Sequence, residues 1–510
     1  MTDHPRQTVL LMTDATRWDM LSCYRQTGVR TPHLDSLAQS GVRFERAYTT
    51  QPVCAPARSA LFTGTWPHSN GTWANSQAPG LDIPTIGQRL RDAGVATAYV
   101  GKWHLDGTDY FGNGRCPDGW DERYWYDMRC YLEELTPEQR RWSRDPGSSS
   151  RPGVTSDLTF AHRCSDRAID FIAAHADQDF LLVVSYDEPH DPAITPPEYA
   201  SRYRGFEFPD DPNTQDDLTG KPEHQRVWAG DRLTEDRSGG YHRRFDQFFA
   251  AQEYVDAQIG RVLGAVSQHA PDALVAYTSD HGDMLGSHRL FAKGPAMYDE
   301  IARIPLLMRL PGGAHDAVHV HPVSHIDFAP TVLEHAGLPV PEIMPGHSLL
   351  PALIDPTTPV DDVVFTEFGR YEVDHDGFGG FQPMRGVFDG RYKLVLHLLS
   401  GDELYDLQDD PGELHNLIED ERLAPVRDAL HDRILAWMND TRDPFRGTYW
   451  RRRPWRTDAP PATWESDGLT RQRPRDPGYQ PPQLDYSTGL EATELVRAKT
   501  PRPVADGFSR

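Results

Sequence analysis

The sequence lacks the features that direct a chain into or across a membrane. Residues 1–7 are polar and lead directly into a short apolar run at 8–12, without the basic start and longer apolar stretch of a signal peptide. No segment is apolar over the roughly 20 residues that a bilayer-spanning helix needs. We therefore expect a cytoplasmic protein with no membrane partner.

Basic residues are scarce relative to acidic ones. The chain has 52 Lys and Arg against 76 Asp and Glu, which gives a formal net charge of −24. Such an acidic chain repels a phosphate backbone, which argues against a general nucleic-acid binder. An anion can still be bound, but only in a pocket that is locally positive.

Cysteine is also scarce. The five residues are an odd number and lack the spacing of a metal-binding clip. We expect four of them to be reduced and structural, namely Cys23, Cys116, Cys130 and Cys164. The fifth, Cys54, stands in a stretch at residues 51–64 that has a chemical character of its own.

Length and composition indicate a two-domain α/β enzyme. The 510 residues include 38% hydrophobic and 10% aromatic side chains, as in soluble globular proteins. In residues 1–355, buried-strand patterns alternate with amphipathic helices, which predicts a catalytic domain with a large mixed, mostly parallel sheet flanked by helices. In residues 356–441, short alternating segments and a helical pattern predict a smaller C-terminal α+β domain with an antiparallel sheet.

The last segment, residues 442–510, is rich in Arg, Pro, Trp and Tyr and has little periodicity. Such a segment is either loosely ordered or lies across the protein or a neighbouring subunit. Because Trp450, Trp455 and Trp464 offer apolar anchors, we expect an ordered arm that wraps across the protein. The arm is therefore the candidate contact for a homo-oligomer.

Polar side chains follow several of the predicted strands. These are Asp14 after residues 8–12, Lys102 and His104 after 95–100, His190 after 180–186, and Asp280 with His281 after 273–278. Open α/β sheets bind their ligands at the carboxyl ends of the strands, so we expect these side chains to converge. Asp14, Asp280 and His281 would suffice to hold a divalent cation with open positions. Taken singly, Lys102 with His104 could also be a basic surface turn, and His190 a loop histidine.

The stretch around Cys54 predicts a helix start. Pro56 has a fixed φ that suits the first helical turn, so Cys54 would lie at the N-terminus, where free N–H groups favour an anion. Arg58, four residues on, falls on the same helical face and could hold a charged oxygen beside residue 54. The alternative is a buried cysteine at a helix cap with a surface arginine, the more frequent case for so short a motif.

Cys54, Pro56 and Arg58 have the spacing Cys-x-Pro-x-Arg, which is the signal that formylglycine-generating enzymes read. The stretch resembles the signature of the type I sulfatases, in the alkaline-phosphatase-like superfamily. The resemblance covers residues 8–440 and rests on five elements in the expected order: Asp14, the Cys54 stretch, Lys102 with His104, His190, and Asp280–His281 with Lys293. It implies the fold of that family and the hydrolysis of an aryl or carbohydrate sulfate monoester.

The resemblance also implies a cofactor and a modification at one site. A formylglycine-generating enzyme would oxidise Cys54 to formylglycine (3-oxoalanine), whose hydrate is both the nucleophile and a metal ligand. The other implied ligands are Asp14, Asp280 and His281. Calcium is the ion expected for the family, and a donor set with a histidine would also suit manganese or zinc.

Five further residues receive implied catalytic roles. Arg58 and Lys102 would orient the diol and neutralise charge in the transition state. His104 would take the proton whose removal releases the covalent sulfate by C–O cleavage. Lys293 and His190 would stabilise the leaving oxygen, which His190 would protonate.

The chain departs from the family pattern at two positions. Ala15 stands where many sulfatases have a second aspartate, and His281 where many have an asparagine. Phosphonate monoester hydrolases of the family have a comparably reduced set, so a formylglycine-dependent phosphonate monoester or phosphodiester hydrolase is the alternative function. A third hypothesis is an inactive member that only binds an anion. The substrate is not readable from composition, although residues 106–155 and 196–243 are expected to shape its pocket.

Overall fold

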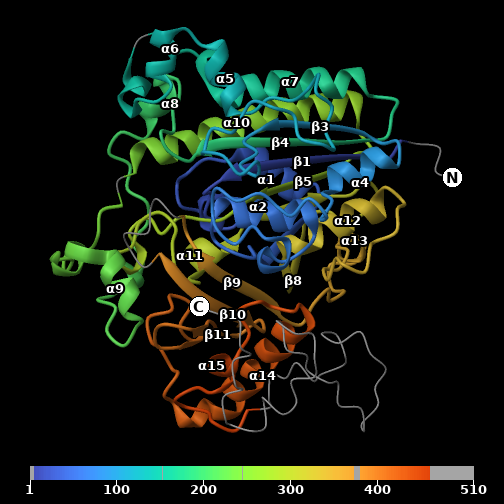
Figure 1. Ribbon diagram of the computed structural model, residues 1–510. Helices are drawn as coiled ribbons and strands as arrows, with labels where there is room; N and C mark the ends of the chain where they lie inside the picture. Colours follow the sequence, from blue (N-terminus) through green and yellow to red (C-terminus); the bar gives the residue numbers. More distant parts are fainter. Residues whose placement is uncertain (1–4, 152, 244, 373–379, 460–510) are drawn as a thin grey trace, which may run out of the picture. The chain divides into compact units, whose positions relative to one another are not determined.

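The computed structural model describes residues 5–459, except 152, 244 and 373–379. Within this part, the larger sheet has the order β3-β4-β1-β5-β7-β2-β6, and β8 also pairs with β2 (Figure 1). Its strands are β1 (Gln7–Asp14), β2 (Val42–Tyr48), β3 (Ala96–Gly101), β4 (Phe180–Pro189), β5 (Leu274–Ser279), β6 (Arg303–Ile304), β7 (Leu306–Arg309) and β8 (Ala317–Ser324).

Strand β1 lies at the centre of the parallel part of this sheet. It pairs in parallel with β4 on one side and β5 on the other, and β3 extends the parallel part beyond β4. Strand β7 runs antiparallel to β5 and β2, whereas β8 is parallel to β2. The prediction of a mixed, mostly parallel sheet is confirmed.

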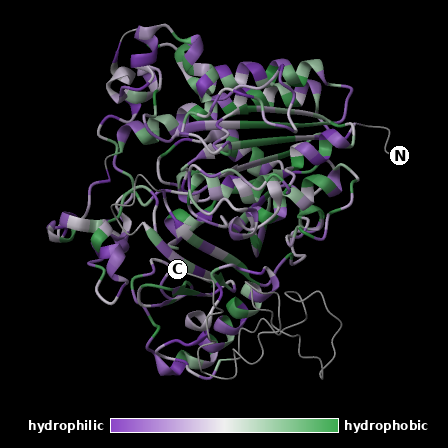
Figure 2. Cartoon of the chain, viewed as in Figure 1, coloured by the Kyte–Doolittle hydropathy of each residue, from purple (hydrophilic) through white to green (hydrophobic). Residues whose placement is uncertain are grey.

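The apolar run of β1 is continuous because both faces of the sheet are covered. Val9 and Leu11 belong to the core on one face, and Leu10 and Met12 to the core on the other. Successive side chains of a strand point to opposite faces, so one short run feeds both cores. Figure 2 shows the central strands as largely hydrophobic.

Helices pack on both faces of the large sheet (Figure 1). On one face lie α1 (Pro32–Gln39), α7 (Phe160–Ala174) and α10 (Asp246–His269). On the other lie α2 (Cys54–Thr63), α4 (Ile86–Asp92), α12 (Phe328–His335) and α13 (Leu350–Ile354). The two helical layers therefore hold the strand ends, and the side chains just beyond them, in fixed positions.

The connecting segments contain short helices that sequence periodicity did not reveal. They are α3 (Pro67–Asn70), α5 (Met128–Glu134), α6 (Pro137–Trp142), α8 (Pro197–Arg202), α9 (Glu223–Ala229) and α11 (Asp299–Ala302). Each is too short to show a helical repeat, but two begin at clear caps. The Asp127 side chain accepts from Cys130 N, and Thr136 forms a capping box with Gln139.

The smaller sheet is antiparallel, as predicted. Its order is β12-β11-β10-β9, with β9 (Val364–Arg370), β10 (Phe381–Phe388), β11 (Tyr392–His397) and β12 (Glu403–Asp406). Helix α14 (Ala424–Asp440) packs against β10 and β11. Met1–Pro460 forms one compact unit that contains both sheets. The predicted domain boundary near residue 355 falls in the connection between α13 and β9, and it stays a prediction.

The first part of the predicted C-terminal arm packs on this smaller sheet and helix. Helix α15 (Thr448–Arg451) carries Trp450, which is fully buried and donates from Nε1 to Phe445 O at 2.6 Å. Trp455 donates from Nε1 to Asp402 at 2.8 Å. Trp464 and the rest of the arm lie outside the described residues, and the homo-oligomer contact stays a prediction.

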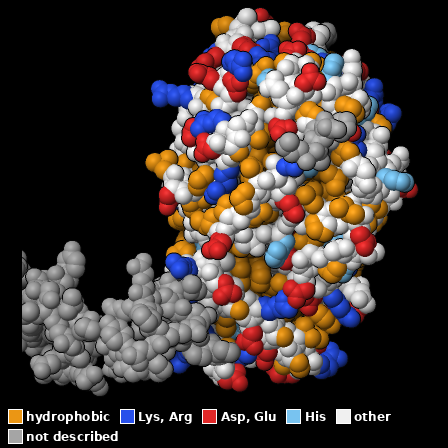
Figure 3. Space-filling view, turned by 90° about the vertical axis from the view of Figure 1, so that its right-hand side faces the viewer, with side chains coloured by type: hydrophobic (Ala, Val, Ile, Leu, Met, Phe, Trp, Pro, Cys, Tyr) orange, Lys and Arg blue, Asp and Glu red, His pale blue; other side chains and the backbone are white. Residues whose placement is uncertain are grey.

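Acidic and basic side chains are intermingled on the face that Figure 3 draws. Although the chain is acidic overall, this face carries no large patch of one charge. In the part of the chain that the structure describes, no helix combines the length and hydropathy needed to cross a membrane. The cytoplasmic location stays a prediction.

Candidate active site

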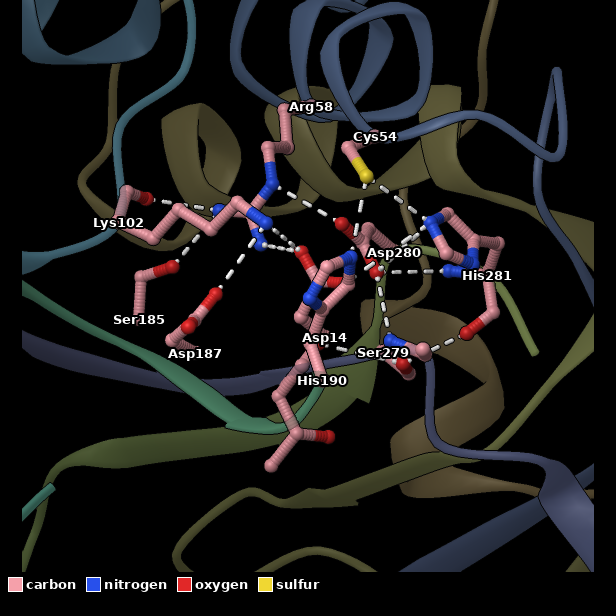
Figure 4. Close-up of polar contacts among 12 residues, drawn as sticks. Asp14, Cys54, Arg58, Lys102, Ser185, Asp187, His190, Ser279, Asp280 and His281 are labelled. Carbon is pink, nitrogen blue, oxygen red and sulfur yellow. Dashed lines mark hydrogen bonds and ion pairs between the residues drawn. The ribbon is translucent and has the colours of Figure 1, made fainter. Parts of the chain in front are cut away.

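The predicted site residues come from the carboxyl ends of adjacent strands and from the start of α2 (Figure 4). Asp14 ends β1, and Asp280 with His281 follows β5. Lys102 follows β3, and His190 follows β4. Because β3, β4, β1 and β5 are neighbours and parallel, their carboxyl ends meet at one edge. The structure thus brings these side chains together with Cys54.

Cys54 is the first residue of α2, as its sequence context predicted. Val53 is extended at the N-cap, with φ of −146°, and Gly64 ends the helix in the left-handed region at φ of 66°. Ala55 N–H, one of the free donors of the first turn, donates to Asn75 Oδ1 at 3.0 Å. Cys54 is 1% exposed, and its Sγ lies 3.1 Å from His281 Nε2.

Arg58 lies on the same helical face as Cys54, one turn further on. It is fully buried, which rules out the alternative of a surface arginine. Its Nη2 lies 3.1 Å from Asp14 Oδ2, and its Nε lies 3.0 Å from Asp280 Oδ2. Nη1 donates to Lys102 O at 2.7 Å and to Ser185 Oγ at 2.8 Å. Every arm of the guanidinium is therefore used, which fixes α2 on the strand ends.

Four donors form a compact cluster that suits a divalent cation. Atoms of Asp14, Cys54, Asp280 and His281 all lie within 4.8 Å of one another, and all four residues are buried. His281 Nδ1 donates to Gly282 O at 2.8 Å, which turns Nε2 toward the cluster. Carboxylate oxygens with one imidazole fit calcium, manganese or zinc.

The pKa values of the two carboxyl groups in the cluster are shifted by the charges around them. Although burial would raise it, the cations of Lys102, Arg58 and Lys293 hold the pKa of Asp14 well below its usual range. Burial and the neighbouring Asp14 raise the pKa of Asp280 to about 6. Two buried carboxylates so close together repel each other, and a bound cation would relieve that repulsion.

Residue 54 itself lies in a field that favours an anion. Burial and Asp14 would raise the pKa of the Cys54 thiol, but Lys293, Lys102 and His281 together lower it to about 6. The pKa of His281 is raised to about 9 because Asp280 and Cys54 outweigh burial. The locally positive pocket that an acidic protein needs for anion binding is therefore present at residue 54.

A second group of possible metal donors has a different character. His68, Glu367 and Asp443 also lie close together and are buried. Arg385 meets them: its Nη2 donates to Asp443 Oδ1 at 2.9 Å, and its Nε lies 3.9 Å from Glu367 Oε2. The arginine supplies the positive charge that a cation would bring, so the cluster around Asp14 is the better metal candidate.

Lys102 and His104 lie beyond the end of β3, which closes at Gly101. Lys102 Nζ is 2.6 Å from Asp14 Oδ2 and 3.3 Å from Asp187 Oδ1. His104 has a left-handed φ of 57°. The backbone is therefore not extended here, and the side-chain alternation of a strand does not determine the direction of the His104 side chain. Burial, Lys102 and Arg58 lower the pKa of His104 to about 3, and its Nδ1 has no hydrogen-bond partner among the residues that the structure describes. A buried neutral imidazole of this kind can accept a proton.

His190 and Lys293 form a pair on the other side of the site. Lys293 Nζ lies 3.0 Å from His190 Nε2, and Lys293 is 5% exposed. Burial, Lys293 and Lys102 lower the pKa of His190 well below its usual range. The imidazole is therefore neutral and accepts a hydrogen bond from the ammonium group.

Sequence reasoning missed several residues that support this site. They are Asn75, which binds the first turn of α2, Ser185, which binds Arg58, and Asp187 and Tyr110, which bind Lys102 and His190. Asp187 could have been found, because it follows the apolar part of β4 just as Asp14 follows that of β1. Tyr110 and Asn75 stand in irregular loops and carry no such signal.

Comparison with known proteins gives a consistent result. A family model described as Sulfatase matches residues 6–338, and one described as N-sulphoglucosamine sulphohydrolase, C-terminal, matches residues 286–440. The uncharacterized sulfatase YidJ of Escherichia coli (strain K12) is 47% identical over 490 residues, which are 94% of this chain and 96% of the relative. A choline-sulfatase of Rhizobium meliloti (strain 1021) is 28% identical, over 79% of this chain and 80% of the relative.

Two solved structures share the fold. One is a protein in complex with its substrate D-glucosamine-2-N,6-O-disulfate, with a TM-score of 0.71 and 22% identity, covering 87% of this chain and 99% of that one. The other is a phosphonate monoester hydrolase of Agrobacterium radiobacter, with a TM-score of 0.71 and 23% identity, covering 85% of this chain and 96% of that one. At such identities the likeness concerns the fold alone.

Proposed function

Because the chain belongs to the sulfatase family and is a sulfuric ester hydrolase, we propose that it cleaves an aryl or carbohydrate sulfate monoester at residue 54. The proposal includes a divalent cation and conversion of Cys54 to formylglycine by a generating enzyme. The observation that carries it is the position of Cys54: at a helix N-terminus, 3.1 Å from His281 and surrounded by the cations of Arg58, Lys102 and Lys293.

The cation and the modified residue supply two kinds of chemistry. Asp14, Asp280, His281 and residue 54 would hold the divalent cation, which would supply the positive charge that lowers the pKa of an oxygen at residue 54. The hydrated formylglycine would offer a second hydroxyl through which sulfate could be released. Calcium is the ion that we propose first, because two carboxylates and an oxygen at residue 54 are hard ligands.

The cationic side chains bind and orient the substrate sulfate. Arg58 and Lys102 are held in place by Asp14, so their charges face residue 54 without reorganisation. His104, neutral and with a free Nδ1, is the base that takes a proton from residue 54. Lys293 and His190 face the leaving oxygen. Because His190 Nε2 accepts from Lys293 Nζ, the proton for that oxygen lies on Lys293 and not on His190, to which the family resemblance gave that role.

One observation favours a second candidate function. The metal cluster has two carboxylates and an imidazole, because Ala15 and His281 stand at the two positions where the chain departs from the common sulfatase pattern. A formylglycine-dependent phosphonate monoester or phosphodiester hydrolase is therefore the alternative.

The test combines a mass measurement with paired substrates. Protein produced beside a formylglycine-generating enzyme is digested, and the peptide over residues 51–58 is weighed; active protein with only an unmodified thiol would contradict the mechanism. The same preparation is assayed with an aryl sulfate, a panel of carbohydrate sulfates and an aryl phosphonate monoester. Preference for the phosphonate supports the alternative, and turnover of none of them supports an inactive, anion-binding member.

A further inference from the structure

Tyr110 stands on a turn that is fixed from both sides. Arg129, on α5, reaches this turn: its Nη2 donates to Asp109 Oδ2 at 3.1 Å and its Nε donates to Gly112 O at 3.1 Å. The ring of Phe111 lies 5.8 Å from the Arg129 guanidinium and 4.9 Å from that of Arg144. These contacts hold the turn in one place, so the direction of the Tyr110 side chain is built into the fold.

The Tyr110 side chain contacts both Lys102 and His190. Its ring centroid lies 4.0 Å from Lys102 Nζ, close enough for a cation–π contact. Its hydroxyl donates to Asp187 Oδ1, and the tyrosine oxygen lies 3.2 Å from His190 Nδ1. Asp187 in turn lies 3.3 Å from Lys102 Nζ. One tyrosine therefore connects Lys102 with His190.

The contacts of His190 determine which of its nitrogens carries the proton. Nδ1 lies 3.0 Å from Asp191 O, which can only accept, and Nε2 lies 3.0 Å from Lys293 Nζ, which can only donate. The proton is therefore on Nδ1. The Tyr110 oxygen, whose own proton goes to Asp187, offers that Nδ1–H a second acceptor on the far side of the ring from Lys293.

We propose that Tyr110 is a positioning residue: anchored on Asp187, its hydroxyl holds the His190 ring so that Nε2 stays on Lys293. The groups around this ring are Tyr110, Lys293, Lys102, Asp187 and Asp14 together with the Asp191 carbonyl. Tyr110 touches neither residue 54 nor the metal donors in any contact found among the described residues. Its hydroxyl acts on the reaction through His190 and, by way of Asp187, through Lys102. The ring also contacts Lys102 and His104, and a phenylalanine would keep those ring contacts.

The consequence for catalysis rests on the proposed function, in which Lys293 and His190 meet the leaving oxygen. A leaving group of high pKa depends on that pair, whereas one of low pKa departs with little help. Loosening the His190 ring should therefore slow the hydrolysis of poor leaving groups far more than that of good ones. A general loss of packing would slow both by the same factor.

The experiment compares Tyr110→Phe with the wild type on aryl sulfates whose phenols span a range of pKa values. We expect kcat/KM to fall about 10–100-fold for the poorest leaving group, as for other residues that orient a catalytic ligand, and to change little for the best one. Tyr126→Phe is the matched control, because it removes another tyrosine hydroxyl that donates to a carboxylate, Glu134, at 2.8 Å. It should leave the whole series unchanged. An equal loss for all leaving groups, or no loss in Tyr110→Phe, would overturn the proposal.

Crystal structures of the wild type, Tyr110→Phe and Tyr126→Phe test the role of Tyr110 independently of the proposed function. If the wild type hydrolyses no sulfate ester, the proposed function fails, and the position of the His190 ring decides the role of Tyr110. The expected result is a rotated ring and a lost contact between Nε2 and Lys293 Nζ in Tyr110→Phe, with both retained in Tyr126→Phe. In that case an unmoved His190 ring in Tyr110→Phe would contradict the role assigned to the tyrosine.

Discussion

Arg58 donates from Nε to Asp280 Oδ2 at 3.0 Å, and neither side chain has any exposed surface. The same guanidinium contacts Asp14, so one side chain of α2 connects the ends of β1 and β5. Charged groups are stable at such depth only when they are paired and hydrogen-bonded. Arg58 therefore supports the stability of the site as well as its charge.

Replacement of Arg58 should destabilise the fold. Arg58→Met leaves the buried Asp280 without its arginine and Asp14 with Lys102 alone, and we expect the free energy of unfolding to fall by about 3–5 kcal/mol. Denaturant unfolding followed by circular dichroism measures this. Arg422→Met is the control, because Arg422 pairs with Asp420 on the surface, where an ion pair contributes little. Equal losses in both variants would contradict this view of Arg58.

Metal content should depend on one of the two donor clusters. Plasma mass spectrometry of purified wild type should find a divalent ion, and Asp14→Asn and His281→Ala should each lose it, because each removes a donor from the proposed site. Glu367→Gln changes the other cluster, where Arg385 already provides the positive charge, and should keep the ion. Metal retained in both Asp14→Asn and His281→Ala would disprove the assignment.

Cys54 should be needed for chemistry but not for folding. We expect Cys54→Ala to abolish turnover of every substrate that the wild type accepts, while its melting temperature stays within a few degrees, because a short side chain at a helix start is removed. Assays and thermal unfolding on the same preparation test this. Cys23→Ala, which removes a half-buried thiol away from the site, should remain active. Activity in Cys54→Ala would return the residue to a structural role.

Much of the site could be predicted because it follows from strand order. The apolar runs before Asp14, His190 and Asp280 were visible in the sequence, and the rule that ligands bind at the carboxyl ends of parallel strands brought them together. The helix at Cys54 was predicted from Pro56, and Arg58 from its spacing. These are local sequence patterns, and the folded protein has the local structure that each of them predicts.

The remaining features depend on contacts that no local pattern encodes. Tyr110 reaches His190 from a loop whose position depends on Arg129 and Arg144, which stand later in the same insertion. The left-handed backbone of His104 likewise has no sequence signal, since histidine is not specific for that conformation. Such residues become visible only when the insertion between β3 and α7 is folded against the sheet.

The pH dependence of stability should reveal a buried acid beside the site. Glu188 is buried near the end of β4 and accepts from Ala161 N at 3.2 Å. Burial and Asp187 raise its pKa to about 8 from an ordinary value of 4.5. The folded protein therefore holds a proton there at neutral pH, whereas the unfolded chain releases it above about 4.3.

Because the folded-state pKa is the higher one, the contribution of Glu188 to stability is complete below its unfolded pKa and is lost as pH rises through about 8. A difference of one pKa unit between the folded and unfolded states corresponds to about 1.4 kcal/mol. Relative to Glu188→Gln, the wild type should therefore lose up to a few kcal/mol of unfolding free energy as the pH rises from the unfolded pKa of Glu188 to its folded pKa. The amide keeps an acceptor for Ala161 N and cannot ionise, so its stability lacks this component. Denaturant unfolding of both proteins between pH 5 and about 9 measures the difference. The exposed Glu138→Gln should follow the wild-type curve, and a Glu188→Gln curve parallel to the wild type would show that Glu188 is ionised in the fold.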